Sequence, residues 1–406
     1  MFGRRKSVMP KGRVKPVAPK PRLKPKPPAA KQAPVREPVR ASHFSQHVLP
    51  IIVQQEEYDR GGADLVYAIV RYMNLMMEDG CYDPSQMPPH AMQSYHTDLY
   101  LAQVNNGGHS QFIGNGKGPH FNETVRNIHI ALQAIGSQSY IKIFGEFLTW
   151  MKQNGRLAAQ QTGFGDIPAA LQDLDKRFFS TAQGLADLNA KWIESWKDLR
   201  VVSKESYKSE MQKLFESNPQ KAENKRIREI RTVKLNLWES QKAKLNYVGF
   251  QSNTHVFVTQ ILPGNYQLIE GRSVPVFPIE TSRGLLLGIF SDHWIGIYRA
   301  VKGDKPRSIH HVLNNELEKV GALISKHKAP AALHLLLKTW PKKDDFKAMI
   351  PNVNKQGQLA VVLLTKRAEM FIVTFADQGA RFYDPARNLI SSLSHRDILA
   401  HSAASF

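Results

Sequence analysis

Between residues 46 and 215, apolar side chains recur every three or four positions, which is the spacing of an amphipathic helix. In GGADLVYAIVRYMNLMMEDG the stripe is Leu65, Ile69, Tyr72 and Met76, and Gly80 stands where a glycine would end the helix. Further stripes are Met92, Tyr95, Leu99 and Ala102; Val125, Ile128, Leu132 and Ile135; Tyr140, Phe144, Phe147 and Met151; and Leu171, Leu174, Phe178, Leu185, Leu188, Trp192 and Trp196. We therefore expect a compact, all-α domain of about five to seven helices.

Residues at the ends of these stripes predict where individual helices begin and end. Asn122 stands at an N-cap position, and Gly136 follows the last apolar residue of the same stripe. Asp166 is placed to cap a later helix, with Pro168 in its first turn, where the missing N–H costs nothing.

From about residue 247 the pattern becomes that of strands, in short β-branched and aromatic runs bounded by Pro, Gly, Asn and Asp. These runs are THVFVTQIL, NYQLI, SVPVFPI, GLLLGIF, HWIGIYRAV, QLAVVLLTKR and MFIVTFA. Asp377, Gln378 and Gly379 predict a hairpin into ARFYDP, and Ser394 with Asp397 predicts a capping box for a last helix. A further helix is expected to start at Ser308, with Ile309, Val312, Leu313, Leu317, Val320 and Ile324 as its face. Residues 247–406 thus predict an α+β domain with a mainly antiparallel sheet.

Residues 216–246 form a charged, helix-favouring segment between these two regions, interrupted by Pro219. The basic residues crowded into it are Lys221, Lys225, Arg226, Arg228, Arg231 and Lys234. Their side chains would form either the solvated face of a linker helix or a basic contact surface.

Charge divides the chain in the same places. The 406 residues are 42% hydrophobic, which is enough for more than one core, and the net charge is +20. Residues 1–45 hold 13 Lys and Arg against 1 acid, residues 46–200 hold 12 against 16, and residues 201–406 hold 30 against 18. A basic tail therefore precedes a mildly acidic domain and a basic region.

The tail, residues 1–45, is rich in Lys, Arg and Pro and has too few apolar residues to form a core, so we expect disorder with a polyproline II bias. It is either a spacer or an electrostatic arm for nucleic acid or another polyanion. The contact candidates are Arg4, Arg5, Lys6, Lys11, Arg13, Lys15, Lys20, Arg22, Lys24 and Lys26. The prolines oppose a third interpretation, a transit peptide, because such peptides form amphipathic helices.

Cysteine content and hydropathy indicate the compartment. Cys81 is the only cysteine, so the chain has no internal disulfide and no thiolate cluster, which fits a reducing compartment. No segment has the roughly 20 apolar residues that span a bilayer. We expect a cytoplasmic protein without a membrane partner.

The stretch VNNGGHSQFIGNGKG, residues 104–118, raises three alternatives. A phosphate cradle would need a preceding strand and a different glycine spacing. A metal site would draw on His90, His96, Asp98, His109, His120 and His129, none of which has a helical HxxxH partner. A turn needs only what the stretch has: Asn105 and Asn106 tolerate left-handed conformations, and Gly107 and Gly108 adopt positive φ. We expect the turn, with Phe112 anchored in the core, Gln111 and Asn115 bonded to loop carbonyls, and neither metal nor cofactor.

The run LYLAQVNNGGHSQFIGN followed by ETVRNIHIALQAIG, and later LQDLDKRFFS with WIESW, resembles a bacterial domain of unknown function named after a DNA-mimic protein. The matching motif residues are Asn106, Gly107, Gly108, Gln111, Phe112 and Asn115. The resemblance covers roughly residues 46–215 and implies an all-helical domain. The namesake sequesters a DNA-binding transcription factor by presenting acidic side chains at phosphate-like spacing.

This chain departs from that family in two respects. The region 46–200 has a net charge of only −4, and basic residues interrupt its acids. These are Lys142, Lys152, Arg156, Lys176 and Arg177. The position after the two glycines, usually aromatic in the family, is His109. The sequence therefore does not predict a phosphate-like ladder.

Residues 247–406 contain residue types suited to catalysis but no recognised catalytic spacing, and they resemble no family. The candidates are His293, His310, His311, His395, Asp292, Asp377 and Asp384. The sequence thus favours a non-catalytic interaction protein whose helical domain contacts a protein partner, such as a DNA-binding regulator, and whose tail attracts nucleic acid or another polyanion. The alternative is an enzyme with a histidine and carboxylate site in residues 247–406.

Overall fold

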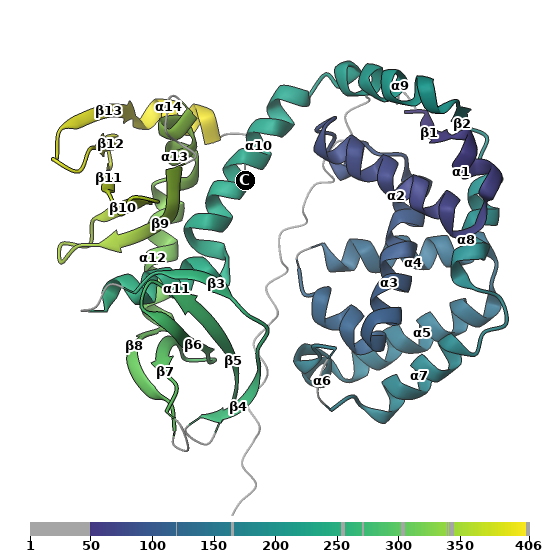
Figure 1. Cartoon of the computed structure of the whole chain (residues 1–406), viewed down its shortest axis with the longest axis horizontal. Helices are drawn as coiled ribbons and strands as arrows, with labels where there is room; N and C mark the ends of the chain where they lie inside the picture. The colour runs from purple at the N-terminus through teal and green to yellow at the C-terminus, as the bar shows by residue number, and fades with distance from the viewer. Residues whose placement is uncertain are drawn as a thin grey trace, which may run out of the picture. The chain divides into compact units, whose positions relative to one another are not determined.

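A computed structural model describes residues 49–118, 120–163, 166–252, 256–269, 272–301, 305–338, 340 and 345–402. Within them a helical region is followed by antiparallel sheets, as the two hydrophobic periods predict (Figure 1). The expected disorder of residues 1–45 lies outside the described residues.

The first region contains more helices than the stripes predict. They are α1 (Gln55–Arg60), α2 (Gly62–Glu78), α3 (Pro89–Asn115), α4 (Phe121–Ile135), α5 (Gln138–Gln153), α6 (Gly155–Gln160), α7 (Ala169–Phe179), α8 (Leu185–Glu194) and α9 (Lys204–Ser217), with the 3-10 turn η1 (Pro84–Gln86). Because α1 and α6 are only six residues long, they are too short to show a period.

The region is not purely α-helical, which corrects the sequence prediction. Strand β1 (Ile51–Gln54) pairs in parallel with β2 (Leu199–Val202), which follows α8. Ile51, Ile52 and Val53 are at most 1% exposed, so a run of three apolar residues joins the two ends of the region. A strand this short carries no detectable alternation.

The apolar stripes predict burial well on α2 and poorly on α3. Leu65, Ile69, Tyr72 and Met76 are all fully buried. On α3 the expected stripe is right for Met92, which is buried, and wrong further along, because Leu99 is 38% exposed while the polar Ser94 and Thr97 are buried. α3 packs against α2, α4, α7 and α8, so the face it buries is wider than one stripe.

Some predicted helix ends hold and others do not. Gly136 ends α4 in a left-handed conformation with φ of 77°. The predicted caps Asn122 and Asp166 are wrong, because His120 and Pro168 occupy those N-cap positions and neither caps with its side chain. After α2 the positive φ belongs to Cys81, at 53°, and not to Gly80.

The charged segment folds into α10 (Lys221–Lys234), a π-helical turn η2 (Leu235–Glu239) and α11 (Gln241–Gln251). Val233, Leu237 and Leu245 lie in the same core as the strands that follow. Arg228 donates to the carbonyl oxygens of Met77 and Glu78, at the end of α2. Part of the basic run is therefore neither solvated nor a free contact surface.

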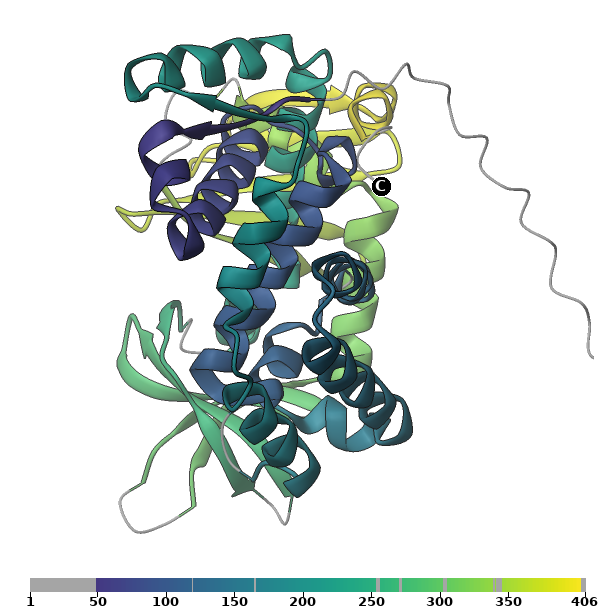
Figure 2. The ribbon, with the colours of Figure 1, turned by 90° about the vertical axis from the view of Figure 1, so that its right-hand side faces the viewer.

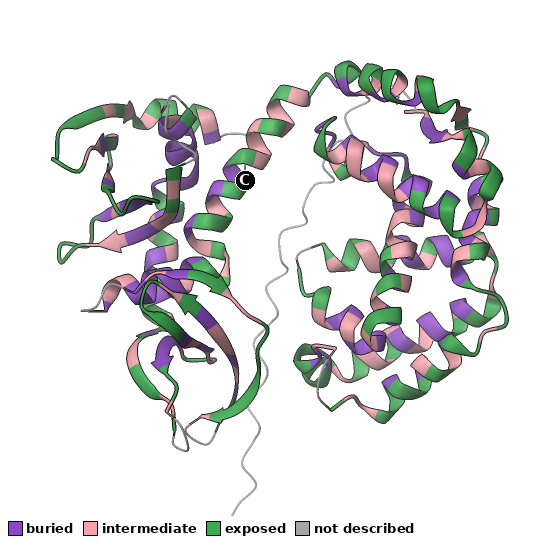
Figure 3. Ribbon diagram, viewed as in Figure 1, coloured by how far each residue is buried: buried purple, intermediate pink, exposed green. Residues whose placement is uncertain are grey.

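Two antiparallel sheets follow. The first contains β3 (Val258–Ile261), β4 (Asn265–Ile269), β5 (Arg272–Thr281), β6 (Gly284–Phe290), β7 (Trp294–Arg299) and β8 (Arg307–Leu313). The second contains β9 (Phe346–Val353), β10 (Leu359–Thr365), β11 (Met370–Ala376), β12 (Gly379–Tyr383) and β13 (Leu389–Ser394). The remaining helices are α12 (Asn314–Lys326), α13 (Ala329–Lys338) and α14 (His395–Ser402). Among the described strands, β4 pairs with β5 alone, and it is exposed along most of its length (Figure 3).

One predicted helix start is wrong and two local predictions are confirmed. Ser308 lies in β8, which pairs with β7, so Ile309 and Val312 belong to a strand and the helix begins only at Asn314. The predicted hairpin joins β11 to β12. In the capping box the backbone N–H of Asp397 donates to the Ser394 hydroxyl at 3.2 Å, and the Ser394 N–H donates back at 3.3 Å.

The two sheets share one hydrophobic core with α12 and α13, and α12 contacts both sheets (Figure 2). Leu333 and Leu336 of α13 are buried there together with Ile297 of β7 and Val361 of β10. The nearly continuous apolar run of α13 shows no helical period in the sequence, which is typical of a helix buried all round.

Candidate functional site

The two glycines of the NGG motif break α3 into two parts that turn back on each other. Gly107 and Gly108 have non-helical backbone angles, whereas the asparagines before them stay helical. The Nδ2 of Asn115 lies 2.6 Å from the Oε1 of Gln103. In a straight helix, residues 12 positions apart would be separated by about 18 Å. The reversal therefore occupies two glycines and not the whole glycine-rich stretch.

The conformation and surroundings of Gly108 account for a glycine at that position. Its φ is 70°, which side-chain-bearing residues rarely adopt, and a Cβ there would lie 2.2 Å from the Oδ2 of Asp175. The expectation of positive φ is wrong for Gly107, whose φ of −168° is extended. The left-handed conformations expected for Asn105 and Asn106 are also wrong, since both stay helical.

The break places His109 in a buried hydrogen-bond chain. Its Nδ1 lies 2.5 Å from the Oδ1 of Asp175, its backbone N–H donates to the same oxygen at 2.8 Å, and its Nε2 lies 2.8 Å from the hydroxyl of Tyr100. A carboxylate only accepts, so Nδ1 carries a proton, and Nε2 shares a hydrogen bond with the Tyr100 hydroxyl. Burial raises the pKa of Tyr100 and keeps this hydroxyl protonated.

This chain of polar groups is enclosed by aromatic rings. His109 is 0% exposed, and its ring contacts those of Phe147 and Phe178 with centroids 5.0 and 6.0 Å apart. The His109 ring is therefore closed to solvent, whereas the side chain of Asp175 stays 16% exposed. We therefore interpret the polar chain as the link that fixes α3 against α7, and not as a catalytic centre.

The remaining motif residues support the same reversal. Phe112 is 2% exposed and packs against Phe121 across the helix pair. Gln111 and Asn115 both donate to the side chain of Gln103, so the prediction that they bond loop carbonyls is wrong. The side chain of Asn106 is exposed and makes no hydrogen bond to another described residue.

The histidines considered as metal ligands are dispersed. His90 contacts Asp198 at 3.1 Å, His96 contacts Asn127 at 3.0 Å, and His129 contacts Gln133 at 3.2 Å. The Nδ1 of His120 lies 3.8 Å from the Oε2 of Glu123. The carboxyl group of Asp98 is partly buried, which raises its pKa. Within the described residues, no three His, Cys, Asp or Glu side chains gather as a metal site would require.

Most catalytic candidates of the second region are separated, but Asp377 and His395 are close enough for His395 to contribute to the lowered pKa of Asp377, after the larger effect of Lys326. His310 and His311 lie on β8, and His293 and Asp292 lie in the exposed turn before β7. The remaining three are placed at the second sheet: Asp377 pairs with Lys326 at 3.1 Å, Asp384 accepts from Asn388 within its own turn, and His395 starts α14.

A histidine pair that the sequence did not single out lies between α10, α13 and α14. The Nδ1 of His334 is 2.7 Å from the Nε2 of His401, and the Nε2 of His334 is 2.9 Å from the Oε2 of Glu229. The pKa of His401 is lowered to about 4. Burial is the largest cause, and the neighbouring His334 and Arg226 lower the pKa further. The side chains of Glu229, His334 and His401 thus connect three helices. These residues are too far apart in the sequence for a sequence pattern to predict that they meet.

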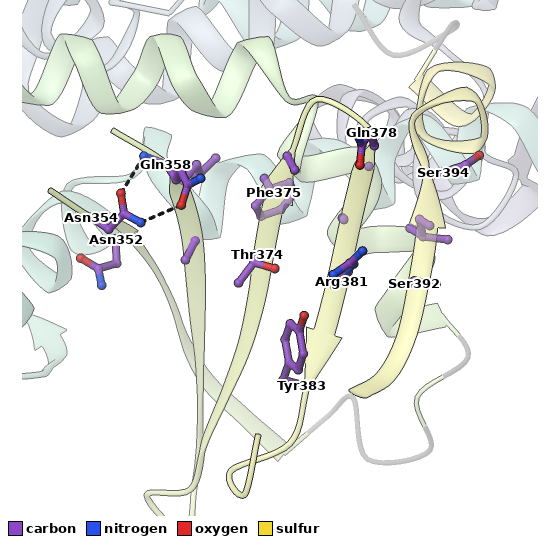
Figure 4. A pocket seen from close by; sticks show the side chains of 16 residues that line it. Asn352, Asn354, Gln358, Thr374, Phe375, Gln378, Arg381, Tyr383, Ser392 and Ser394 are labelled. Atoms are coloured by element: carbon purple, nitrogen blue, oxygen red, sulfur yellow. Dashed lines mark hydrogen bonds between the residues drawn. The ribbon is translucent and has the colours of Figure 1, made fainter. Parts of the chain in front are cut away.

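The outer face of the second sheet forms a polar hollow of about 610 Å³ (Figure 4). Its hydrogen-bonding residues are Asn352, Asn354, Gln358, Thr374, Gln378, Arg381, Tyr383, Ser392 and Ser394. Its described lining contains no His, Asp or Glu. The alternation of polar and apolar residues in ARFY and MFIVTF signals such an outward face, although it does not show that the face is hollow.

The ten Lys and Arg candidates for polyanion contact, from Arg4 to Lys26, lie outside the described residues. None of the described helices combines the length and the apolar composition that crossing a membrane requires.

Comparison with known proteins shows that part of the helical region is similar to a family. Residues 85–196 match the family model described as DMP19-like protein. The match contains the NGG motif, His109 and Asp175, and it agrees with the resemblance seen in the sequence at the level of a domain of unknown function. No curated protein matches the chain.

Among solved structures, the crystal structure of the complex of PDZ-RhoGEF DH/PH domains with GTP-gamma-S activated RhoA aligns with 10% identity and a TM-score of 0.11. The alignment covers 87% of this chain and 95% of that chain. A TM-score this low carries no argument about the fold.

Proposed function

We propose that this protein is a non-catalytic binding protein. Its helical domain contacts a protein partner, and residues 1–45 attract nucleic acid or another polyanion. The observation that carries the proposal is the charge partition, with 13 Lys and Arg against 1 acid in residues 1–45 and 12 against 16 in residues 46–200. Opposite charges on neighbouring parts of one chain suit simultaneous contact with a polyanion and with a basic protein surface.

The sheet face supports binding over catalysis. Its hollow contains amides, hydroxyls and one guanidinium, which can orient a ligand by hydrogen bonds. Its described lining has no His, Asp or Glu, the residue types that most often transfer protons near neutral pH. The His109 and Asp175 pair has the residue types of a catalytic dyad, but the His109 ring is fully buried among aromatic rings.

Exposed aromatic side chains support partner contact by the helical domain. Tyr67 on α2 is 65% exposed and Phe179 at the end of α7 is 59% exposed. Aromatic residues are enriched among those that carry binding energy at protein interfaces. The DMP19-like match and the resemblance to a DNA-mimic protein suggest a DNA-binding regulator as the class of partner.

Affinity capture with the full chain as bait tests the protein-partner part. We expect a protein that stays bound after nuclease digestion and is lost when Tyr67→Ala and Phe179→Ala are combined. Leu268→Ala is the matched control, because Leu268 is 74% exposed but lies on β4, outside the helical domain. Retention that needs intact nucleic acid, or that the double variant leaves unchanged, would contradict the proposal.

A further inference from the structure

The strand register lines up a row of side chains across the second sheet. Asn352 pairs with Ala360, Ala360 with Thr374, Thr374 with Arg381, and Arg381 with Ser392. Directly paired residues of neighbouring strands point to the same face. Thr374, Arg381 and Ser392 therefore stand side by side in the hollow, with Arg381 in the middle (Figure 4).

The other face of the same strands is turned inward. Val373 and Phe375 flank Thr374 and are at most 4% exposed, and Ala380 and Phe382 flank Arg381 and are 1% exposed. The core thus fixes the strands, so the outward row is held by a packed sheet and not by a loop.

The polar side chains of the row can form hydrogen bonds with a ligand. Among the described residues, none forms a hydrogen bond or ion pair with the side chain of Thr374, Arg381, Ser392 or Tyr383. Other residues of the hollow are already engaged: Asn354 accepts from the backbone N–H of Gln356 and Gln358, and Ser394 donates to Asp397 at 2.6 Å.

The hollow has one charge, and it is positive. Arg381 is the only charged residue in the described lining, and the nearby Asp377 is already paired with Lys326 at 3.1 Å. A guanidinium presents a planar fork of N–H donors that matches two oxygens of a carboxylate or phosphate. Hydroxyls on both sides of it, about 5 Å away across the strands, can donate to the same group.

Tyr383 adds an apolar surface next to the charge. It lies two residues after Arg381 on the same face, and its register partners are Ile372 and Leu389. An oxyanion held at Arg381 would place the body of its molecule against this ring, which favours a ligand with a flat or partly apolar part.

We propose that the row Thr374, Arg381 and Ser392, together with Tyr383, binds the oxyanion, carboxylate or phosphate, of a small polar molecule. The site goes beyond the proposed function, because it lies on the second sheet, whereas partner contact is assigned to the helical domain and polyanion contact to the tail.

Calorimetric titration of the full chain tests the site with four probes: inorganic phosphate, adenosine monophosphate, glucuronate and uncharged glucose. We expect at least one anionic probe to bind and glucose not to bind. Arg381→Ala should weaken binding about tenfold or more, since hydrogen bonds to charged groups are strong. Arg381→Lys should retain part of the affinity, because it keeps the charge and loses the fork.

Arg367→Ala is the matched control, because Arg367 is exposed on the turn before β11 and does not line the hollow. Binding of adenosine monophosphate without glucuronate assigns the oxyanion to phosphate, and the reverse assigns it to carboxylate. If no anionic probe binds, if glucose binds equally well, or if Arg381→Ala and Arg367→Ala behave alike, the proposal is wrong. Anion binding by the tail is distinguishable, since Arg381 does not affect it.

Discussion

At the residue scale, Gly108 and His109 show why the NGG motif contains these residue types. Gly108 has a positive φ, and a Cβ at this position would collide with the carboxylate of Asp175. The same carboxylate is hydrogen-bonded to the Nδ1 of His109. His109 replaces the aromatic residue usual in the resembling family and still contacts the rings of Phe147 and Phe178. The position thus retains its aromatic packing and gains two polar partners.

Gly108→Val should destabilise the helical domain by about 3 kcal/mol, because a β-branched residue is strained at positive φ and would displace Asp175. Urea unfolding followed by the helical circular dichroism signal measures the change. Gly145→Ala is the control: Gly145 lies within α5 and a Cβ there meets nothing within 4 Å. It should stabilise the domain by about 0.5–1 kcal/mol. A Gly108→Val variant as stable as the wild type would contradict our account of the motif.

At the element scale, the sequence predicted many of the helices and strands but missed β9 and β13. It also failed where pairing with another element determines the local structure. The expected face of α2 is fully buried. The segment around Ser308 has apolar spacing compatible with a helix, but pairing with β7 makes its first part a strand. Such pairing is a long-range interaction that the local pattern does not contain.

The contacts of α14 give a prediction on pH. Folding lowers the pKa of His401 to about 4 from an ordinary value of about 6.5, so the folded chain binds fewer protons than the unfolded chain between these values. The groups facing His401 are His334 and Lys338 of α13 and Arg226 and Glu223 of α10. The contribution of neutral His401 to stability is therefore complete above about pH 6.5 and is lost as the pH falls towards 4.

Hydrogen exchange of the α14 amides at about pH 7 and about pH 5, corrected for intrinsic rates, measures this effect. We expect protection to fall at the lower pH in the wild type and to change much less in His401→Gln, whose amide keeps a donor without titrating. Protection of α14 that falls equally in both proteins would show that another group is responsible.

At the scale of the whole molecule, the sequence predicted the order of a helical region and antiparallel sheets, together with the location of the NGG motif. It did not predict the polar chain of Tyr100, His109 and Asp175, although one signal was present: Asp175 is an acid beside Leu174 on an apolar helix face. The row through Arg381 was not predictable, since it depends on the register of five strands.

The central claim, that residues 1–45 attract a polyanion by charge, is tested most directly by the salt dependence of nucleic-acid binding to the full chain. Three proteins are compared by fluorescence anisotropy: the wild type, a variant with the ten Lys and Arg candidates from Arg4 to Lys26 changed to Gln, and a variant with the same tail residues in shuffled order.

We expect the logarithm of the wild-type binding constant to fall linearly with the logarithm of salt concentration, because each neutralised phosphate releases counterions. The shuffled tail should behave like the wild type, whereas the Gln variant should lose most of the affinity and of the slope. Equal slopes for the wild type and the Gln variant, or loss of binding on shuffling alone, would contradict the account.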